Sequence, residues 1–333
     1  MSLGLNELYM ILGFALSAYA IVANDSIQTL GTFIASNHQR PWWHLWLFAS
    51  GILVVVLLYS WLANGGDPAY GRLEEFPYRP GSYQLIHVIP PIALIILTRY
   101  GMPVSTTFLI LTFFHPDNLE KMVEKSLLGY AVAFVVAIAA FWVVHKTLLA
   151  VDPDAAHAGE SEEARAHHTP LWSLLLTLST GFLWTQWLIQ DLANLFIYFP
   201  HHPDPLPVGW LALGLGLMVG MQALIFRNGA GEIQQIVEQK SGASDVREAA
   251  IINFVYAGVI LYFKEHSNMP MSTTWVFLGL LAGRELSYRL VERESLKGAW
   301  RMALSDLSKA TLGLAVSVVL AVGVPWLFTR LGG

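Results

Sequence analysis

Long apolar segments alternate with short polar stretches along the whole chain, and they fall into two similar series. The first series covers residues 5–36, 42–63, 84–98, 104–115 and 127–149. The second covers residues 171–199, 208–226, 249–263, 272–283 and 304–327. Several of these segments approach or exceed the ~18 apolar residues that are typical of a membrane span. The pattern therefore predicts an all-α membrane protein.

Some of these segments have lengths that do not suit a simple crossing. Segments 5–36 and 171–199 are longer than a hydrocarbon core of about 30 Å requires, and they carry the polar stretches "NDS" and "QDLAN". They predict interrupted helices. Segments 84–98 and 104–115 are too short to cross and are joined by a tight "RYGMP". They predict a re-entrant helical hairpin, and segments 249–263 and 272–283 predict a second one.

The two series keep the same spacing between their polar motifs. Asp25 and Ser105 are 80 residues apart, and Asp191 and Ser272 are 81 residues apart. We therefore expect two transmembrane repeats, residues 1–150 and 171–333, joined by a polar linker at residues 151–170. Each repeat has an interrupted helix, full spans and a hairpin. It crosses the membrane three times, so the two repeats are predicted to have inverted topology.

Charged residues are few, and they orient the chain. Only 13% of the residues are charged and 55% are hydrophobic, against about 25% charged in soluble domains. The net charge of −5 argues against nucleic acid, and the absence of cysteine excludes disulfides and thiolate metal sites.

The basic stretch "GRELSYRLVERESLKGAWR" and the 151–170 linker are predicted to be cytoplasmic, with both termini, loop 67–82 and "HHPDPLP" outside. The first hairpin then opens outward and the second inward. The apolar N-terminus lacks a basic leader pattern, so we expect it to stay as the first span. Residues 228–248 are polar and predict a surface helix.

A triplet of hydroxyl residues begins the second limb of each predicted hairpin. They are Ser105, Thr106 and Thr107, and Ser272, Thr273 and Thr274. A helix start offers free N–H groups and the positive end of the helix dipole, and hydroxyls add donors. The paired tips therefore predict a binding site for an anion near the membrane midplane. The alternative is ordinary N-capping of two unrelated helices.

Two carboxylates lie inside the interrupted helices. Ionisable groups at membrane depth usually mark the path of an ion or proton. Amide side chains accompany them, giving the candidate cation ligands Asn24, Asp25, Gln28, Gln190, Asp191 and Asn194. Na⁺ bound at Asp25 and Asp191, or a proton carried there, fits this chemistry, and an aspartate that only caps a broken helix is the alternative.

Other polar residues suggest weaker roles. Arg99 and Lys264 precede the two tips, where they could hold an anion or snorkel to the interface. The histidines of the linker and of "HHPDPLP" are predicted to be solvated rather than bound to a metal, because their spacing is irregular.

The motifs together resemble one transporter family. "VANDSIQTLGT" with "GMPVSTT", repeated as "IQDLANLF" with "NMPMSTT", is similar to the inorganic phosphate transporter (PiT) family. The resemblance implies uptake of inorganic phosphate driven by Na⁺ or H⁺, usually by a homodimer. It implies a cation at Asn24, Asp25, Asp191 and Asn194, and phosphate at the hydroxyl triplets. The chain departs from the family pattern at Ser26, Gln28, Gln190, Phe108 and Trp275, which leaves the coupling ion and the choice between phosphate and sulfate open.

The sequence thus predicts a cation-coupled phosphate symporter rather than an enzyme. It needs no cofactor beyond Na⁺ or H⁺, and it is expected in the plasma membrane of a bacterial-type cell, in contact with lipid. A sulfate permease and a passive anion channel of the same fold are alternatives. An intramembrane aspartyl protease would use the two aspartates but not the hydroxyl-rich tips.

Overall fold

Helices make up the regular structure of this chain, with no strand in the part described. The computed structural model describes residues 4–37, 40–100, 104–146, 170–228 and 246–330, without the side chains of residues 25–28, 32, 35–36 and 329. Within these ranges, six helices are long and apolar enough to cross a membrane. The chain is therefore an integral membrane protein with an all-α fold. Most of the predicted linker at residues 151–170 and most of the polar stretch at residues 228–248 lie outside the described residues.

Both predicted interruptions fall at the polar motifs. Helix α1 (Leu5–Ile21) continues through a π-helical turn, η1 (Val22–Ser26), into α2 (Ile27–Ser36). Helix α8 (Pro170–Asp191) ends at its aspartate and is followed by the single turn α9 (Ala193–Phe196). The first break is thus a wide turn that keeps the helix running, as π turns at functional sites often do. The second is a short interruption at Leu192, whose backbone stays in the right-handed helical region. Helices α3 (Trp42–Ala63) and α10 (Val208–Arg227) follow the two interrupted segments as full spans.

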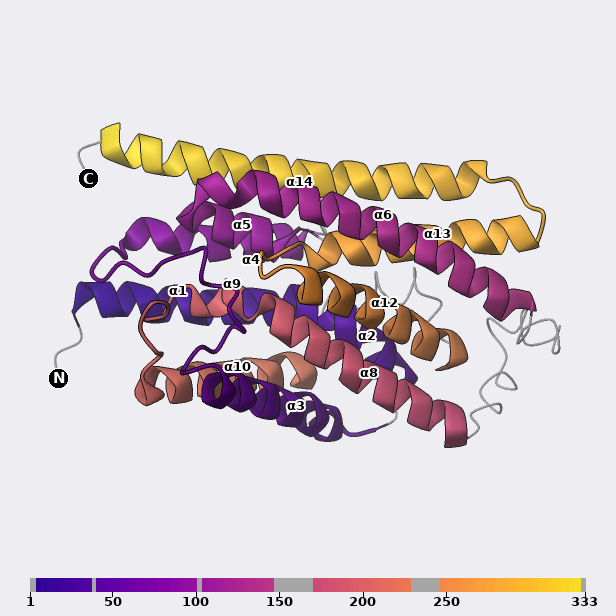
Figure 1. Cartoon of the computed structure of the whole chain (residues 1–333), viewed down its shortest axis with the longest axis horizontal. Coiled ribbons are helices and arrows are strands. Elements are labelled where there is room, and N and C mark those ends of the chain that lie inside the picture. The colour runs from indigo at the N-terminus through magenta and orange to yellow at the C-terminus, as the bar shows by residue number, and fades with distance from the viewer. Residues whose placement is uncertain (1–3, 38–39, 101–103, 147–169, 229–245, 331–333) are drawn as a thin grey trace.

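The two hairpins meet in the middle of the molecule. The first consists of η2 (Leu85–Val88) with α4 (Ile89–Arg99), followed by α5 (Thr106–Phe114). The second consists of α12 (Val246–His266) and α13 (Thr273–Val291), which run in from the end of the molecule opposite the two termini (Figure 1). The predicted short limbs of the second hairpin were wrong in length, because both helices continue well past the apolar segments 249–263 and 272–283.

A buried ion pair explains why these limbs are longer than the apolar pattern predicts. Arg284 donates to Glu248 across 2.6 Å, both side chains are almost fully buried, and Tyr288 also hydrogen-bonds Glu248. A charged residue ends an apolar segment of the sequence. Inside the protein, however, a helix can continue past that residue when its charge is paired. Much of the stretch predicted to be a cytoplasmic loop is therefore the last part of α13.

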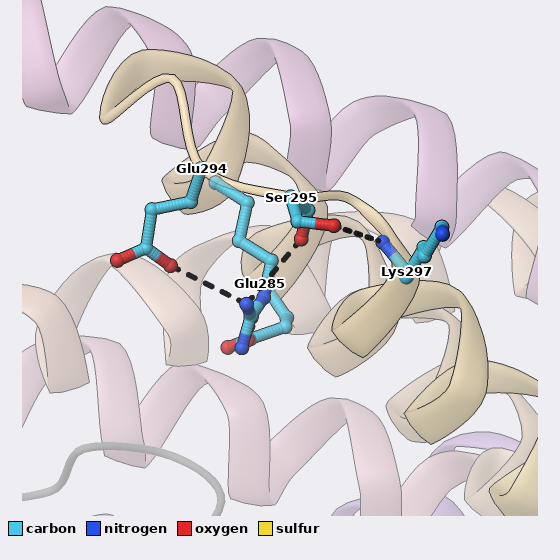
Figure 2. Close-up of polar contacts among 5 residues, drawn as sticks. Glu285, Glu294, Ser295 and Lys297 are labelled. Carbon is cyan, nitrogen blue, oxygen red and sulfur yellow. Dashed lines mark hydrogen bonds and ion pairs between the residues drawn. The ribbon is translucent and has the colours of Figure 1, made fainter.

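Two further long helices each follow a polar turn. Helix α6 (Leu119–Val144) follows the short η3 (Pro116–Asn118), and α14 (Lys297–Arg330) runs along one side of the molecule for almost its full length (Figure 1). The turn from α13 to α14 is tied by Arg289, which binds Glu285 at 2.7 Å and Glu294 at 3.3 Å. In the same turn, the backbone N–H of Lys297 donates to the Ser295 hydroxyl (Figure 2).

Two glycines let α13 lie directly against α6. A Cβ atom added at Gly279 would collide with the carbonyl oxygen of Tyr130, and one added at Gly283 would collide with that of Phe134. Small residues four apart allow this close approach between membrane helices. The contact matters for the site because α13 begins at the second hydroxyl triplet.

Candidate functional site

Each hydroxyl triplet begins with a helix cap. The Ser105 hydroxyl accepts a hydrogen bond from the backbone N–H of Phe108 at 3.2 Å, and the Ser272 hydroxyl accepts one from Trp275 at 3.3 Å. Both serines have extended backbone conformations, as N-cap residues do. The capping role that the sequence left as an alternative is thus present at both tips. It leaves the hydroxyl protons of the two serines available to a ligand.

The two tips contact each other through equivalent residues. Thr107 donates to the carbonyl oxygen of Met271 at 3.2 Å, and Thr274 donates to that of Val104 at 3.5 Å. Each pair is offset by 167 residues, since 271 − 104 and 274 − 107 give the same number. Tips that come from distant parts of the chain therefore exchange matching hydrogen bonds, which unrelated capped helices have no reason to do.

The residues that follow the triplets continue this pairing. The rings of Phe108 and Trp275, offset by the same 167 residues, meet edge to face with their centroids 5.5 Å apart. Both side chains are buried, and the indole Nε1 of Trp275 has no hydrogen-bond partner among the described residues. The two departures from the family pattern therefore form one apolar contact beneath the tips.

The break after α8 brings the second amide and carboxylate pair to the first tip. Asn194 donates to Asp191 Oδ1 at 2.8 Å, and to the hydroxyls of Thr106 and Thr107 at 3.3 Å each. Thr107 also lies 3.4 Å from Asp191 Oδ1. Asp191 and Asn194 of the second half are therefore in direct contact with the triplet of the first half.

Several oxygens around this carboxylate have no protein donor. Asp191 Oδ2, Asn194 Oδ1 and both polar atoms of Gln190 have no hydrogen-bond partner within the described part of the chain, although all three residues are buried. Buried polar atoms are rarely left this way unless a ligand or water meets them. Carboxylate and amide oxygens are ligands that hard cations such as Na⁺ accept, so this donor set fits a cation.

The first interrupted helix contributes in a corresponding way. Asn24, within the π turn, donates to the carbonyl oxygen of Val104 at 3.1 Å. It therefore supports the first tip from the side of η1. The side chains of Asp25 and Gln28 lie outside the described residues, so their predicted role stays a prediction.

The whole site is enclosed. The six hydroxyl residues of the two triplets are at most 4% exposed, and Asn24, Gln190, Asp191 and Asn194 are at most 1% exposed. Polar residues from four separate parts of the sequence thus gather in one buried cluster. This geometry suits a ligand that is held away from both aqueous sides.

Arg72 is a neighbour of the site that the sequence did not indicate. It belongs to the polar loop between α3 and η2, and yet it is only 1% exposed. Its Nε donates to the carbonyl oxygen of Ile189 at 3.0 Å, and its Nη1 donates to that of Asn268 at 3.2 Å. Burial lowers the pKa of Arg72 to about 10, and the nearby Asp191 opposes that shift. A polar loop of this kind gives no sequence signal that one of its arginines is inserted among the helices.

Other residues support the second tip from α6 and α12. Lys125 donates to the carbonyl oxygens of Ser267 and Met269 at 2.9 and 2.6 Å. The Ser126 hydroxyl accepts from the backbone N–H of Ser272 at 2.8 Å, and the Tyr256 hydroxyl donates to the carbonyl oxygen of Thr273 at 2.9 Å. The turn before the second triplet is thus held by buried side chains of neighbouring helices.

Three other predicted polar residues lie apart from the site. Arg99 is exposed, and Lys264 pairs with Glu265 at 2.9 Å at the surface, so neither side chain reaches the buried cluster. His201, predicted to be solvated, is 2% exposed, with its ring nitrogens 2.6 and 2.7 Å from the carbonyl oxygens of Phe199 and Phe76. That prediction was wrong, because the loop containing "HHPDPLP" folds back over the aromatic core.

The fold, but not the sequence, has a known counterpart. No protein family model matches the sequence, and no curated protein matches it. The solved structure of a sodium-dependent phosphate transporter is similar over 98% of this chain and 99% of that one, with a TM-score of 0.60 and 16% sequence identity. At that identity the likeness shows a shared fold, and it extends over nearly the whole length of both chains.

Proposed function

We propose that this protein carries inorganic phosphate across the membrane together with a cation, Na⁺ or H⁺. The observation that carries the proposal is the meeting of the two hydroxyl-rich helix starts, where Thr107 and Thr274 exchange hydrogen bonds with the opposite tip. Two helix N-termini that meet inside the protein supply N–H groups and partial positive charge for an oxyanion. The fold shared with a sodium-dependent phosphate transporter supports the same function.

In this proposal the hydroxyl triplets bind the anion. Their residues are Ser105, Thr106, Thr107, Ser272, Thr273 and Thr274. The triplets offer hydroxyl donors and first-turn amides without requiring a fixed cation at every anion oxygen. The threonine bonds that now join the tips are the ones that a bound oxyanion would replace or bridge.

The coupling cation is proposed to bind at the two broken helices, beside the anion. Asp191 Oδ2, Asn194 Oδ1 and Gln190 Oε1 are buried oxygens with no donor in the described part of the chain. Asn24, Asp25 and Gln28 are the matching candidates in the first half. Because Asp191 and Asn194 contact Thr107 directly, occupancy of one site changes the hydrogen bonds of the other. This contact is the physical basis that we propose for coupling.

Alternating access is proposed to follow from the inverted arrangement of the two halves. One hairpin is predicted to open outward and the other inward, so movement of either half would expose the central site to one side only. We expect the protein in a bacterial-type plasma membrane, as a homodimer, and cross-linking in membranes would test the oligomeric state.

Uptake into proteoliposomes tests the proposal directly. We expect radiolabelled phosphate to accumulate when a Na⁺ or proton gradient is imposed, and an excess of unlabelled phosphate to compete with it. Labelled sulfate, assayed in parallel, decides between the two oxyanions. If neither anion moves under any cation gradient, the proposal fails. Rapid flux that no gradient stimulates would instead indicate a passive anion channel.

A conservative variant tests the cation half of the proposal. Asp25→Asn keeps the size of the side chain but removes its charge. We expect it to lower cation-dependent phosphate uptake more than it lowers the amount of folded protein in the membrane. Equal losses of uptake and folded protein would assign Asp25 a structural role.

A further inference from the structure

The loop between α3 and η2 places a positive charge inside the helical core. Arg72 is almost fully buried, and three carbonyl oxygens accept from it: those of Ile189 at the end of α8, and those of Asn268 and Met269 in the turn before the second tip, at 3.0, 3.2 and 3.5 Å. Burying a guanidinium is costly, so its remaining donors should be satisfied as well. Its Nη2 nevertheless has no hydrogen-bond partner among the described residues.

The same region holds an incompletely paired negative charge. Asp191 lies two residues after Ile189, whose carbonyl oxygen binds Arg72, and its Oδ2 has no partner in the described residues. Arg72 and Asp191 are close enough to interact electrostatically, but no ion pair joins them within the described ranges. A buried guanidinium and a buried carboxylate thus lie in the same part of the core, and each has one polar atom without a hydrogen-bond partner in the described residues.

We propose that Arg72 is a tethered counter-ion of Asp191 that competes with the coupling cation of the second half. When no mobile cation is bound, the guanidinium neutralises the carboxylate from a distance and fastens α8 to the second hairpin. A cation that binds at Asp191 meets the field of Arg72, which lowers its affinity and weakens the hold of Arg72 on the carbonyls of the hairpin turn. Cation binding and release of the second hairpin are then linked through one side chain.

A cavity beside the same turn offers cations a place to gather. It has a volume of about 300 Å³ and is lined by Asp67, Glu74 and Asp204, together with Asn268. The carbonyl oxygen of Asn268 is one of the acceptors that Arg72 holds. Carboxylates around a cavity raise the local concentration of cations. The inference rests on the proposed cation-coupled transport, and it identifies the group that sets the cation affinity.

Lys125 provides a matched control for the charge of Arg72. It is also a partly buried cation, and it binds carbonyl oxygens of the same turn, those of Ser267 and Met269. It approaches from α6, however, and interacts electrostatically with Arg72, whereas Arg72 interacts with Asp191 directly. Loss of either side chain should loosen the turn, whereas only loss of Arg72 should remove the positive field at Asp191.

The test measures Na⁺ binding to the purified protein in detergent by calorimetry, without phosphate, and the Na⁺ dependence of phosphate uptake in proteoliposomes. Arg72→Gln is expected to bind Na⁺ about tenfold more tightly than the unmodified protein, because a buried unit charge near the site is removed. Lys125→Gln is expected to leave the Na⁺ affinity nearly unchanged. Both variants should lose some thermal stability.

A titratable variant keeps the proposal testable if Arg72→Gln does not fold. Arg72→His carries the charge in acid and loses it in alkali, with a reference pKa of about 6.5. Its Na⁺ affinity should therefore rise with pH more steeply than that of the unmodified protein measured over the same range. If Na⁺ affinity in this variant follows the unmodified protein at every pH, the counter-ion role is wrong.

Other outcomes separate this inference from the proposed function. Equal Na⁺ affinities in Arg72→Gln and Lys125→Gln would overturn it, and so would an Arg72→Gln effect on the phosphate KM alone, which would make Arg72 an anion ligand. Phosphate transport by a protein that binds no Na⁺ would overturn the inference and leave phosphate transport standing. A protein that moves no anion but shows the expected shift in Na⁺ affinity would support the inference and overturn the proposed phosphate transport.

Discussion

Thr107 is the residue whose hydroxyl touches the most partners in the site, so its replacement by valine gives the sharpest prediction. Valine keeps the shape of the side chain and removes only the hydroxyl. That hydroxyl has Met271 O at 3.2 Å and Asp191 Oδ1 at 3.4 Å as possible acceptors, and it accepts from Asn194 Nδ2 at 3.3 Å. One proton can serve only one of those acceptors at a time, so the variant loses one donated and one accepted bond.

The expected cost follows from what each partner keeps. Asn194 Nδ2 still donates to Asp191 at 2.8 Å and to Thr106 at 3.3 Å. The carbonyl oxygen of Met271 loses the donor supplied by Thr107 and is left buried, which costs about 1–3 kcal/mol. The bonds lost are long for a hydroxyl, so we expect a cost at the low end of that range, about 1–1.5 kcal/mol. If the hydroxyl contributes equally to phosphate binding, the KM for phosphate rises about tenfold.

Two threonines serve as controls within the same fold. Thr112 is equally buried in α5, but its hydroxyl has no partner among the described residues, so Thr112→Val should leave both thermal stability and the phosphate KM nearly unchanged. Thr274→Val removes a bond of 3.5 Å to Val104 and should have an effect between the two. Thermal unfolding in detergent and initial rates of labelled phosphate uptake measure both quantities.

The relative effects of these variants on the phosphate KM and on thermal stability test the role of the Thr107 hydroxyl. If Thr112→Val raises the phosphate KM as much as Thr107→Val, the loss reflects disturbed packing of α5, and the role given to the tip hydroxyl is refuted. If Thr107→Val lowers thermal stability but leaves the KM unchanged, the cross-tip hydrogen bond is structural only.

Three further substitutions have expected outcomes of their own. Gly283→Ala should lower stability by about 1–3 kcal/mol, because its Cβ would meet the backbone of α6. Gly258→Ala in α12, where a Cβ meets nothing within 4 Å in the described structure, should be neutral or stabilising. Equal melting temperatures for the Gly283→Ala and Gly258→Ala variants would contradict the close α6–α13 contact. Glu248→Gln should cost about 3–5 kcal/mol by removing the negative charge that pairs with the buried Arg284, whereas Glu265→Gln in the surface pair should change the melting temperature little. Asn194→Ala should weaken both Na⁺ activation and phosphate binding, since Asn194 joins Asp191 to the first triplet, and an effect on only one of the two would argue against coupling through this side chain.

The central features of the site could be predicted from sequence because they are local. Polar residues such as Asn24 and Asp191 within apolar segments mark where a membrane helix must bend or end, whatever surrounds it. Ser105 and Ser272 each stand directly before an apolar run, where a hydroxyl can cap the helix that follows. The nearly equal spacing of these motifs in the two halves predicted that the tips would correspond, and the contacts of Thr107 and Thr274 show matching residues at the interface.

The residues that surround the site depend on contacts between distant segments, and no local pattern reveals them. Arg72 is one arginine in a polar loop until the fold brings Ile189 and Asn268 to it, 117 and 196 residues away in sequence. In the sequence, Arg284 marks the end of an apolar segment, whereas in the structure it pairs with Glu248, 36 residues earlier. A charge counts against burial in any hydropathy average, and only a partner supplied by tertiary structure offsets the cost of desolvating it. The sequence by itself therefore determined where the interrupted helices and the hydroxyl-rich helix starts lie, whereas the tertiary structure decided which charges lie inside.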